Sequence, residues 1–187
     1  MNIIGITGTL GAGKGTIVEL LTKEYNYAHY SVREYLIEEI ENRGMEVNRD
    51  SMTIVANDLR ANNSPSFITD QLYIRAKENN ANCIIESIRT PGEIDSLRKK
   101  GDFYLFAVDA DSKVRYQRIQ IRKSSTDNID YDTFVANEER EMNTDDPNKQ
   151  NLAKCISMAD FVFNNNGDFE QLNNQLREVI AKLLIQK

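Results

Sequence analysis

A glycine-rich string directly after an apolar segment constrains this chain more than any other feature of its sequence. Residues 8–16 read G-T-L-G-A-G-K-G-T and follow the apolar run of residues 3–6. Glycines let backbone N–H groups converge on an anion, and a helix that leaves such a turn directs its positive dipole end at the same anion. Apolar residues at 17, 18, 20 and 21 predict that helix. The string therefore predicts a buried strand, a phosphate-binding loop and a helix in succession.

The string completes the pattern G-x-x-x-x-G-K with Gly8, Gly13 and Lys14, and it departs from the common form at Gly15, where Ser or Thr usually follows the lysine. The alternative is a glycine-rich turn without a ligand, but the lysine, the extra glycines and the flanking pattern together favour a bound nucleotide polyphosphate. The residues expected to bind it are Gly8, Gly11, Ala12, Gly13, Lys14, Gly15 and Thr16.

Composition limits the partners of the chain. Its 187 residues carry Lys+Arg 23 against Asp+Glu 29, a formal net charge of −6, which argues against a general nucleic-acid binder. Cys83 and Cys155 lie far apart and show no metal-ligand spacing, so a thiol-containing cytoplasmic protein is expected. No window approaches about eighteen apolar residues, so neither a membrane span nor a membrane partner is expected. We expect one domain of residues 1–187; its oligomeric state has no signal in the sequence.

Apolar periodicity divides the chain into alternating strands and helices. Strands are predicted over residues 2–7, 28–30, 83–85, 103–108 and 161–163. Helices are predicted over residues 15–25, 32–42, 49–61, 65–78, 91–101, 111–123, 131–142, 148–158 and 168–185, with Ser64 capping the helix that starts at Pro65. Short apolar strands separated by helices indicate an α/β fold of three layers, with a five-stranded parallel sheet covered on both faces.

Two long interruptions of this pattern are expected to carry the second substrate. A helical insertion of residues 32–80 separates the second and third strands, and a lid region of residues 112–145 follows the fourth strand. In folds of this kind, insertions at the carboxyl ends of parallel strands overhang the ligand crevice.

Charged residues at the predicted strand ends suit phosphoryl transfer, which spreads negative charge over the migrating group and needs cations and positioning. Lys14 is expected to reach the β- and γ-phosphates, and Thr16 has the hydroxyl nearest the Mg²⁺ position. Glu86 ends a buried strand and is predicted to orient the metal's water shell beside the substrate, unless it only faces solvent. Arg89 is expected to grip an acceptor phosphate, unless it forms a surface ion pair with Glu93.

The region after the fourth strand carries arginines and acids. Arg115, Arg118 and Arg122 lie along one helical face, beside a polar turn of residues 123–130. They are either a solvated face or lid cations that close on the transferring phosphate and exclude water. The acidic residues between positions 130 and 146 are interpreted as solvated helix faces without metal-ligand spacing, and the polar cluster of residues 142–147 receives no function.

Residues of the helical insertion are candidates for acceptor binding. Ser31, Arg33 and Arg60 are placed at the acceptor, the two arginines on its phosphate, and Tyr35 is placed near a base. Both arginines could equally pair with local carboxylates. His29, the single histidine, is interpreted as a hydrogen-bonded structural residue.

Three segments resemble known small-nucleotide kinases. The string at residues 8–16 resembles the P-loop of adenylate kinase and related nucleoside monophosphate kinases, including the glycine after the lysine. Residues 159–172 resemble the A-D-x-V-I-x-N-x-G-x-x-x-x-L signature of dephospho-CoA kinases, and residues 86–89 are similar to the acid-plus-arginine segment that ends strand 3 in nucleotide kinases. The resemblance implies a strand order of 2-3-1-4-5, ATP and Mg²⁺ as cofactors, and Asn165 and Gly167 near the donor's adenine.

The resemblance also implies that the arginine helix is a lid, with Arg115 on the donor and Arg118 and Arg122 acting in catalysis with Lys14 and Arg89. Two departures leave the acceptor open. The insertion lacks the T-G-D-x-x-R run expected of adenylate kinase, and residues 31–34 read S-V-R-E where dephospho-CoA kinases have an early aspartate.

These observations predict an ATP-dependent phosphotransferase whose acceptor is a small nucleotide, foremost a (deoxy)nucleoside monophosphate and next dephospho-CoA. A GTPase switch would need an N-K-x-D motif, and the nearest string, N-K-Q-N at residues 148–151, ends in asparagine. A sensor that binds ATP without transferring phosphate remains as an alternative class.

Overall fold

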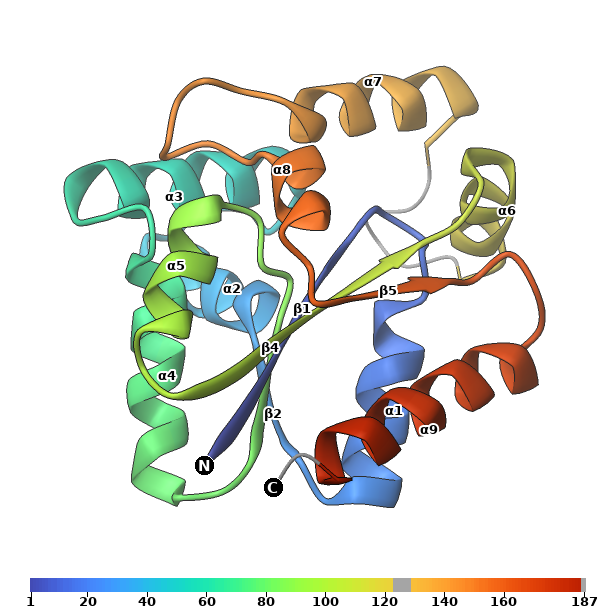
Figure 1. The fold of residues 1–187 in the computed structure, drawn as a ribbon. Helices are drawn as coiled ribbons and strands as arrows, with labels where there is room; N and C mark the ends of the chain where they lie inside the picture. Colours follow the sequence, from blue (N-terminus) through green and yellow to red (C-terminus); the bar gives the residue numbers. More distant parts are fainter. Residues whose placement is uncertain (123–128, 186–187) are drawn as a thin grey trace.

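Five parallel strands form the centre of the molecule (Figure 1). The computed structural model describes residues 1–122 and 129–185. The strands are β1 (Asn2–Gly8), β2 (Ala28–Ser31), β3 (Cys83–Glu86), β4 (Asp102–Asp109) and β5 (Phe161–Asn164). Their order is β2-β3-β1-β4-β5, and every neighbouring pair is parallel. The predicted α/β class and the expected strand order are therefore confirmed.

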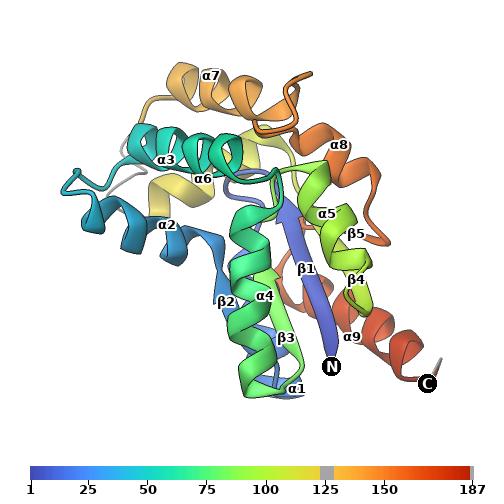
Figure 2. The ribbon, with the colours of Figure 1, turned by 90° about the vertical axis from the view of Figure 1, so that its left-hand side faces the viewer.

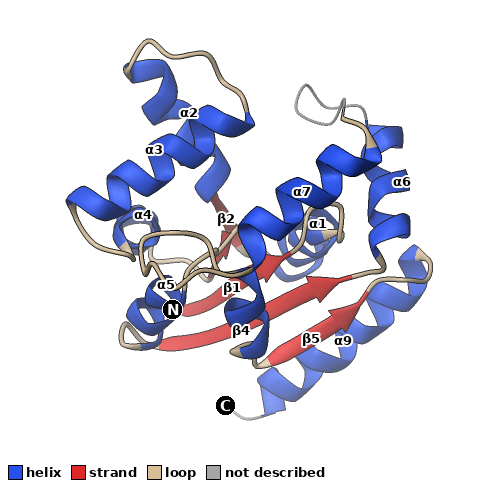
Figure 3. Cartoon of the chain, turned by 90° about the horizontal axis from the view of Figure 1, so that it is seen from above, coloured by secondary structure: helices blue, strands red, loops and turns tan. Residues whose placement is uncertain are grey.

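Helices cover both faces of the sheet, as Figures 1 and 2 show. The helices are α1 (Lys14–Tyr25), α2 (Val32–Asn42), α3 (Arg49–Asn62), α4 (Phe67–Asn79), α5 (Pro91–Arg98), α6 (Ser112–Arg122), α7 (Tyr131–Met142), α8 (Leu152–Ser157) and α9 (Phe169–Ile185). One face packs on α1 and α9, and the other on α4, α5 and α8. Seen from above in Figure 3, α2 and α3 lie beside the carboxyl ends of the strands and α7 crosses over them.

The alternation of side chains along buried strands divides the core in two. Ile3 of β1 belongs to the cluster under α2 to α5, whereas Ile4 and Ile6 belong to the cluster under α1 and α9. The same alternation runs through β3, where Ile84 and Ile85 face opposite layers. Because both faces are covered, β1 reads as a continuous apolar run. Because helices cover both faces of the sheet, the polar loops lie at its carboxyl edge.

Some helix boundaries differ from the prediction. α4 begins at Phe67, because residues 64–67 form a turn in which the Phe67 N–H donates to the Ser64 carbonyl, 3.0 Å. The predicted helix over 148–158 contains only α8, whose N-cap is Asn151; the Asn151 side chain accepts from Lys154 N and donates to the Thr144 carbonyl. The cluster of residues 142–147 is thereby an ordered return loop from α7 to α8. Most of the predicted polar turn of residues 123–130 lies outside the described residues.

Within residues 1–122 and 129–185, no helix combines the length and the apolar composition needed to cross a bilayer.

Candidate active site

The glycine loop between β1 and α1 requires glycine at two positions for steric reasons. Gly13 has φ 101°, and a Cβ placed there would lie 2.2 Å from Nδ2 of Asn165. Gly8 has φ 140°, and its Cβ would lie 2.1 Å from the Val108 carbonyl oxygen. Both the left-handed backbone and the close approach of neighbouring chain exclude a side chain. The loop is therefore held tightly between β4 and the segment after β5.

The first turn of α1 is left open for an anion. Its N-cap residue is Gly13, and no side chain caps it. In contrast, α2, α3, α5, α7 and α8 each have a side chain that accepts from a backbone N–H of the first turn. The uncapped N–H groups and the helix dipole suit a phosphate at this position.

Lys14 lies over the loop. Its Nζ donates to the carbonyl oxygens of Gly8 and Thr9, both at 2.9 Å. Burial, and after it the charge of Arg89, lowers the pKa of Lys14 from 10.5 to about 8. The side chain is thus a cation at neutral pH, in a position where a phosphate can replace the two carbonyls as its partner.

Glu86 ends β3 beside the strand that feeds the loop, in register with Ile6 of β1. It accepts a hydrogen bond from Ser87 Oγ at 3.0 Å, and its Oε2 lies 3.6 Å from Nε2 of His29. Burial alone would raise the pKa of Glu86, but the His29 imidazole and the Lys14 charge outweigh it and lower the pKa to about 2. Glu86 is therefore an ionised carboxylate at the strand end.

The chain leaves β3 through a strained residue. Ser87 has φ 74°, which is uncommon for a residue with a side chain and costs about 1–3 kcal/mol. The N–H groups of Ser87 and Ile88 both donate to the Ile6 carbonyl at 3.0 Å, and Thr7 Oγ1 donates to the Ile88 carbonyl at 2.8 Å. These bonds to β1 hold the turn that carries Arg89 to the carboxyl edge of the sheet.

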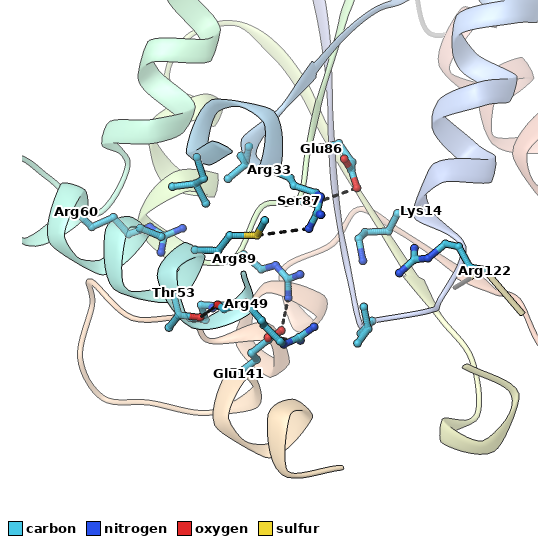
Figure 4. A pocket seen from close by; sticks show the side chains of 16 residues that line it. Lys14, Arg33, Arg49, Thr53, Arg60, Glu86, Ser87, Arg89, Arg122 and Glu141 are labelled. Atoms are coloured by element: carbon cyan, nitrogen blue, oxygen red, sulfur yellow. Dashed lines mark hydrogen bonds and ion pairs between the residues drawn. The ribbon is translucent and has the colours of Figure 1, made fainter. Parts of the chain in front are cut away.

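A cavity of about 310 Å³ opens between the loop and the helical insertion (Figure 4). Its wall combines apolar side chains of α2 and α3 with many charged groups. The apolar residues are Leu10, Val32, Leu36, Met52 and Ala56, and Thr53, Ser87 and Gln150 are polar. The cations are Lys14, Arg33, Arg49, Arg60, Arg89 and Arg122, and the carboxylates are Glu86 and Glu141. The cation excess contrasts with the net charge of −6 of the whole chain, and a wall of this charge suits an anionic ligand.

Glu141 and Arg49 are cavity residues that the sequence did not reveal. Glu141 of α7 is 5% exposed and accepts from Arg49 NH2 at 2.5 Å and from Arg89 NH1 at 2.7 Å. Burial would raise the pKa of Glu141, but the Arg89 and Arg49 guanidinium groups hold it below its usual value. The interpretation of the acids of this region as solvated was wrong for Glu141 and for Glu138. A signal existed, because both stand at helical spacing from the buried Phe134.

The three arginines of α6 have different partners. Arg115 is buried: its Nε donates to the Ala110 carbonyl, its NH1 donates to the Leu10 carbonyl, and its NH2 pairs with Glu138 at 2.6 Å. Arg118 NH2 donates to the Gly167 carbonyl at 3.4 Å. Arg122 lines the cavity with Lys14. Arg115 therefore supports the loop and α7 through internal contacts, and of the three Arg122 is the one at the cavity.

Other predicted site residues also have structural partners. Asn165 is 6% exposed and its Nδ2 donates to the Ala12 carbonyl at 2.8 Å, so it holds the loop. Ser31 caps α2 by accepting from Glu34 N. Tyr35 is 7% exposed in the core, with Arg75 5.0 Å from its ring centre. Ser31 and Tyr35 are absent from the described wall of the cavity: Ser31 is the buried N-cap of α2, and Tyr35 belongs to the core cluster.

The remaining predicted residues meet at the cavity. Arg33, Arg60, Glu86 and Arg89 line it together with Lys14, although they come from four separate segments of the chain, with Glu86 and Arg89 in the same one. The Arg89 side chain pairs with Glu141, so the alternative of a side-chain ion pair with Glu93 is not what the structure has. The contact between Arg89 and Glu93 is a hydrogen bond from the Arg89 backbone N–H. Thr16 is half-buried in the first turn of α1, and Gly15 has open space around it.

Comparison with known proteins agrees with this fold and loop, which define a protein with a P-loop fold. The family model described as "AAA domain" matches residues 4–146. A UPF0200 protein of Methanococcus maripaludis is 30% identical over 187 residues, with 98% of each chain covered. The chain therefore belongs to the AAA-domain family and, with this relative, to the UPF0200 proteins.

Solved structures share the fold at low sequence identity. The protein TT1252 from Thermus thermophilus has a TM-score of 0.63 and 21% identity, with 97% of each chain covered. Shikimate kinase from Bacteroides thetaiotaomicron has a TM-score of 0.59 and 14% identity, covering 97% of this chain and 98% of its own. At these identities the likeness establishes a common P-loop kinase fold, and it says nothing about the acceptor.

Proposed function

We propose that this protein is an ATP-dependent phosphotransferase that phosphorylates a (deoxy)nucleoside monophosphate. The observation that carries the proposal is the single cavity that joins the P-loop lysine to arginines of the helical insertion. Transfer of a phosphoryl group between two anions needs cations around the migrating group and little covalent chemistry. Lys14 of α1, Arg89 of the loop after β3 and Arg122 of α6 supply those cations.

The residues present fit ATP and Mg²⁺. The uncapped first turn of α1 and Lys14 suit the donor phosphates. Thr16 and the ionised Glu86 would hold the Mg²⁺ shell. The described residues contain no cluster of three or more His, Cys, Asp or Glu able to hold a metal. Mg²⁺ at nucleotide sites is usually bound through one or two side chains, water and substrate phosphates. When bound, such an ion would neutralise part of the charge of the donor phosphates.

The chain's own residues would position the acceptor. Arg89 lies in the cavity with its guanidinium held by Glu141, and Arg49 approaches the same carboxylate from α3. Two arginines that share one carboxylate keep a positive charge for an acceptor phosphate. Closure of α6 and α7 over the cavity would exclude water, which would otherwise hydrolyse the donor.

A coupled ADP-release assay tests the proposal. The chain is incubated with ATP, Mg²⁺ and a panel of ribo- and deoxyribonucleoside monophosphates, with dephospho-CoA as a further acceptor. We expect acceptor-dependent ADP release with at least one monophosphate, and we expect Lys14→Met to lower its rate by at least ~10²-fold, because the transition state loses a cation.

The other outcomes separate the alternatives. Release with dephospho-CoA alone would replace the acceptor class and leave phosphoryl transfer standing. ATP binding without acceptor-dependent release from any compound would refute the kinase and favour a nucleotide sensor. Lys23→Met, on the exposed side of α1, is the matched control for the lysine variant.

A further inference from the structure

Arg60 is a buried cation, and two of its hydrogen-bond donors have no partner in the described structure. Its side chain is 1% exposed, and its NH2 donates to Glu93 Oε1 at 3.0 Å. Its Nε and NH1 are buried and have no hydrogen-bond partner in the described structure. Buried donors in native proteins are nearly always paired, because an unpaired one loses its water without compensation. Since Arg60 also lines the cavity, a ligand is the partner that these donors lack.

The charge of Arg60 is already balanced. Glu93 is fully buried, and its second oxygen accepts from the N–H groups of Arg89 at 2.7 Å and Thr90 at 3.0 Å. A ligand anion placed against Arg60 would therefore lie close to a buried carboxylate, and the two negative charges would repel each other in a medium of low dielectric. A neutral acceptor avoids that cost. Arginine has only donors, so the group that it favours is a neutral carbonyl oxygen.

Other cations of the cavity lie away from Arg60. In Figure 4, Arg60 enters from the side of α3 and points toward the middle of the cavity, whereas Lys14 and Arg122 enter from the other side. Arg49 and Arg89 both pair with Glu141, so these three side chains together have a net charge of +1. The acceptor phosphate thus belongs at the Lys14 end, away from Arg60.

Apolar side chains also line the cavity. Val32 and Leu36 of α2 and Met52 and Ala56 of α3 line the cavity. Aliphatic side chains of this kind pack well against the face of a flat ring. Phosphate, ring and carbonyl then follow one another along the cavity.

On the basis of the function proposed above, we infer that the acceptor is a nucleoside monophosphate with an oxo base, whose exocyclic carbonyl accepts from Arg60. Uracil, thymine, hypoxanthine and guanine offer such an oxygen. Cytosine and adenine carry an amino group at the corresponding position, so its N–H donors would face the N–H donors of Arg60. Arg60 is then the residue that selects the base, and the phosphate is left to the other arginines.

Two matched ligand pairs isolate this single atom. UMP and CMP differ at the oxo or amino group of C4, and IMP and AMP differ in the same way at C6. Direct binding of each to the full chain is measured by calorimetry, without ATP. We expect UMP to bind more tightly than CMP and IMP more tightly than AMP, each by ~10- to 100-fold, the range for a hydrogen bond to a charged group.

Variants of Arg60 connect the preference to this side chain. Arg60→Gln has an amide that can donate or accept, so both ratios should fall toward one. Because Arg60→Gln alone leaves Glu93 buried and unpaired, the double change Arg60→Gln with Glu93→Gln removes both charges together. Thermal unfolding verifies that each variant folds. Arg43→Gln, which alters an exposed ion pair with Asp58, is the control and should keep the native ratios.

Each outcome has a distinct meaning. Equal affinities within both pairs, or tighter binding of the amino bases, would overturn the inference and leave the kinase proposal intact. Failure of all four to bind would also overturn it, and ADP release with dephospho-CoA would then show that phosphoryl transfer survives. Oxo-selective binding that disappears with Arg60, without ADP release from any monophosphate, would support the base selection and refute the kinase.

Discussion

Lys14 is the residue whose chemistry depends most directly on its surroundings. Two loop carbonyls accept from its Nζ, and burial together with Arg89 lowers its pKa to about 8. A lysine in this state is still charged at neutral pH, but it is desolvated in advance of binding. The free energy of folding offsets the cost of that desolvation. A phosphate would therefore bind a cation that has already lost most of its water.

The lowered pKa makes donor binding depend on pH. As pH rises through about 8, free Lys14 loses its proton, and a neutral amine cannot pair with a phosphate. We expect the affinity for Mg²⁺–ATP, measured by calorimetry, to be level between pH 7 and 7.5 and to fall by ~10-fold by pH 9.5. Lys14→Met should bind weakly with no such slope. A wild-type affinity that stays level to pH 9.5 would contradict the assignment.

The same shift has a consequence for stability. The folded pKa of Lys14 lies below the unfolded value of 10.5, so between pH 8 and 10.5 the unfolded state binds more protons. The contribution of Lys14 to the free energy of unfolding therefore rises with pH across that window. Below pH 8 the burial cost is present in full.

At the scale of the element, the three arginines of α6 contact different parts of the molecule. Arg115 in its first turns holds the Leu10 carbonyl and Glu138, Arg118 contacts the Gly167 carbonyl, and Arg122 at its end lines the cavity. A regular helix spaces these groups at 1.5 Å per residue, so one rigid element reaches the loop, the segment after β5 and the cavity. Closure of α6 would move all three contacts together.

Arg122→Ala tests the proposed role of Arg122 in phosphoryl transfer. We expect kcat in the ADP-release assay to fall by ~10²-fold with a smaller change in the KM for ATP, because the guanidinium acts on charge that develops during transfer. Lys113→Ala, an exposed cation on the same helix, should leave kcat unchanged. If Arg122→Ala raises only the KM, Arg122 contributes to ground-state binding instead.

At the scale of the whole molecule, an acidic protein concentrates cations in one place. The carboxylates that balance this concentration come from distant parts of the chain: Glu86 from β3, Glu93 from α5 and Glu141 from α7. The pKa values of Glu86 and Glu141 both lie below their ordinary values. Ionised carboxylates thus tie the helical insertion and α7 to the sheet.

This arrangement predicts acid sensitivity. The folded pKa of Glu86, about 2, lies below the unfolded value of 4.5, so its stabilisation is present above pH 4.5 and is lost as pH falls toward 2. Glu86 can contribute up to about 3 kcal/mol at neutral pH. We expect the free energy of unfolding in urea to decrease between pH 5 and 3, and to decrease less steeply in Glu86→Gln. Glu170→Gln, at an exposed position, should keep the wild-type slope; equal slopes in all three proteins would contradict the prediction.

Local patterns were sufficient for much of the fold. The buried strands β1 and β3, the loop glycines and most helices follow from apolar periodicity and from turn residues close in sequence, and the strand order followed from resemblance to kinases. Glu86 and Arg89 could be placed at the crevice because parallel strands bring their carboxyl ends to one edge. Errors arose where a side chain competed for the backbone, as Asn151 does at the start of α8.

The sequence by itself determined that a phosphate-binding loop joins a buried strand to a helix, because glycine, lysine and apolar spacing act over a few residues. Only the tertiary structure decided which charges face the ligand. Arg115 and Asn165 support the loop, Arg49 and Arg89 share Glu141, and Arg60 is balanced by Glu93. These pairings join residues from 33 to 153 positions apart in the chain. Long-range packing brings such partners together, and no local pattern specifies them.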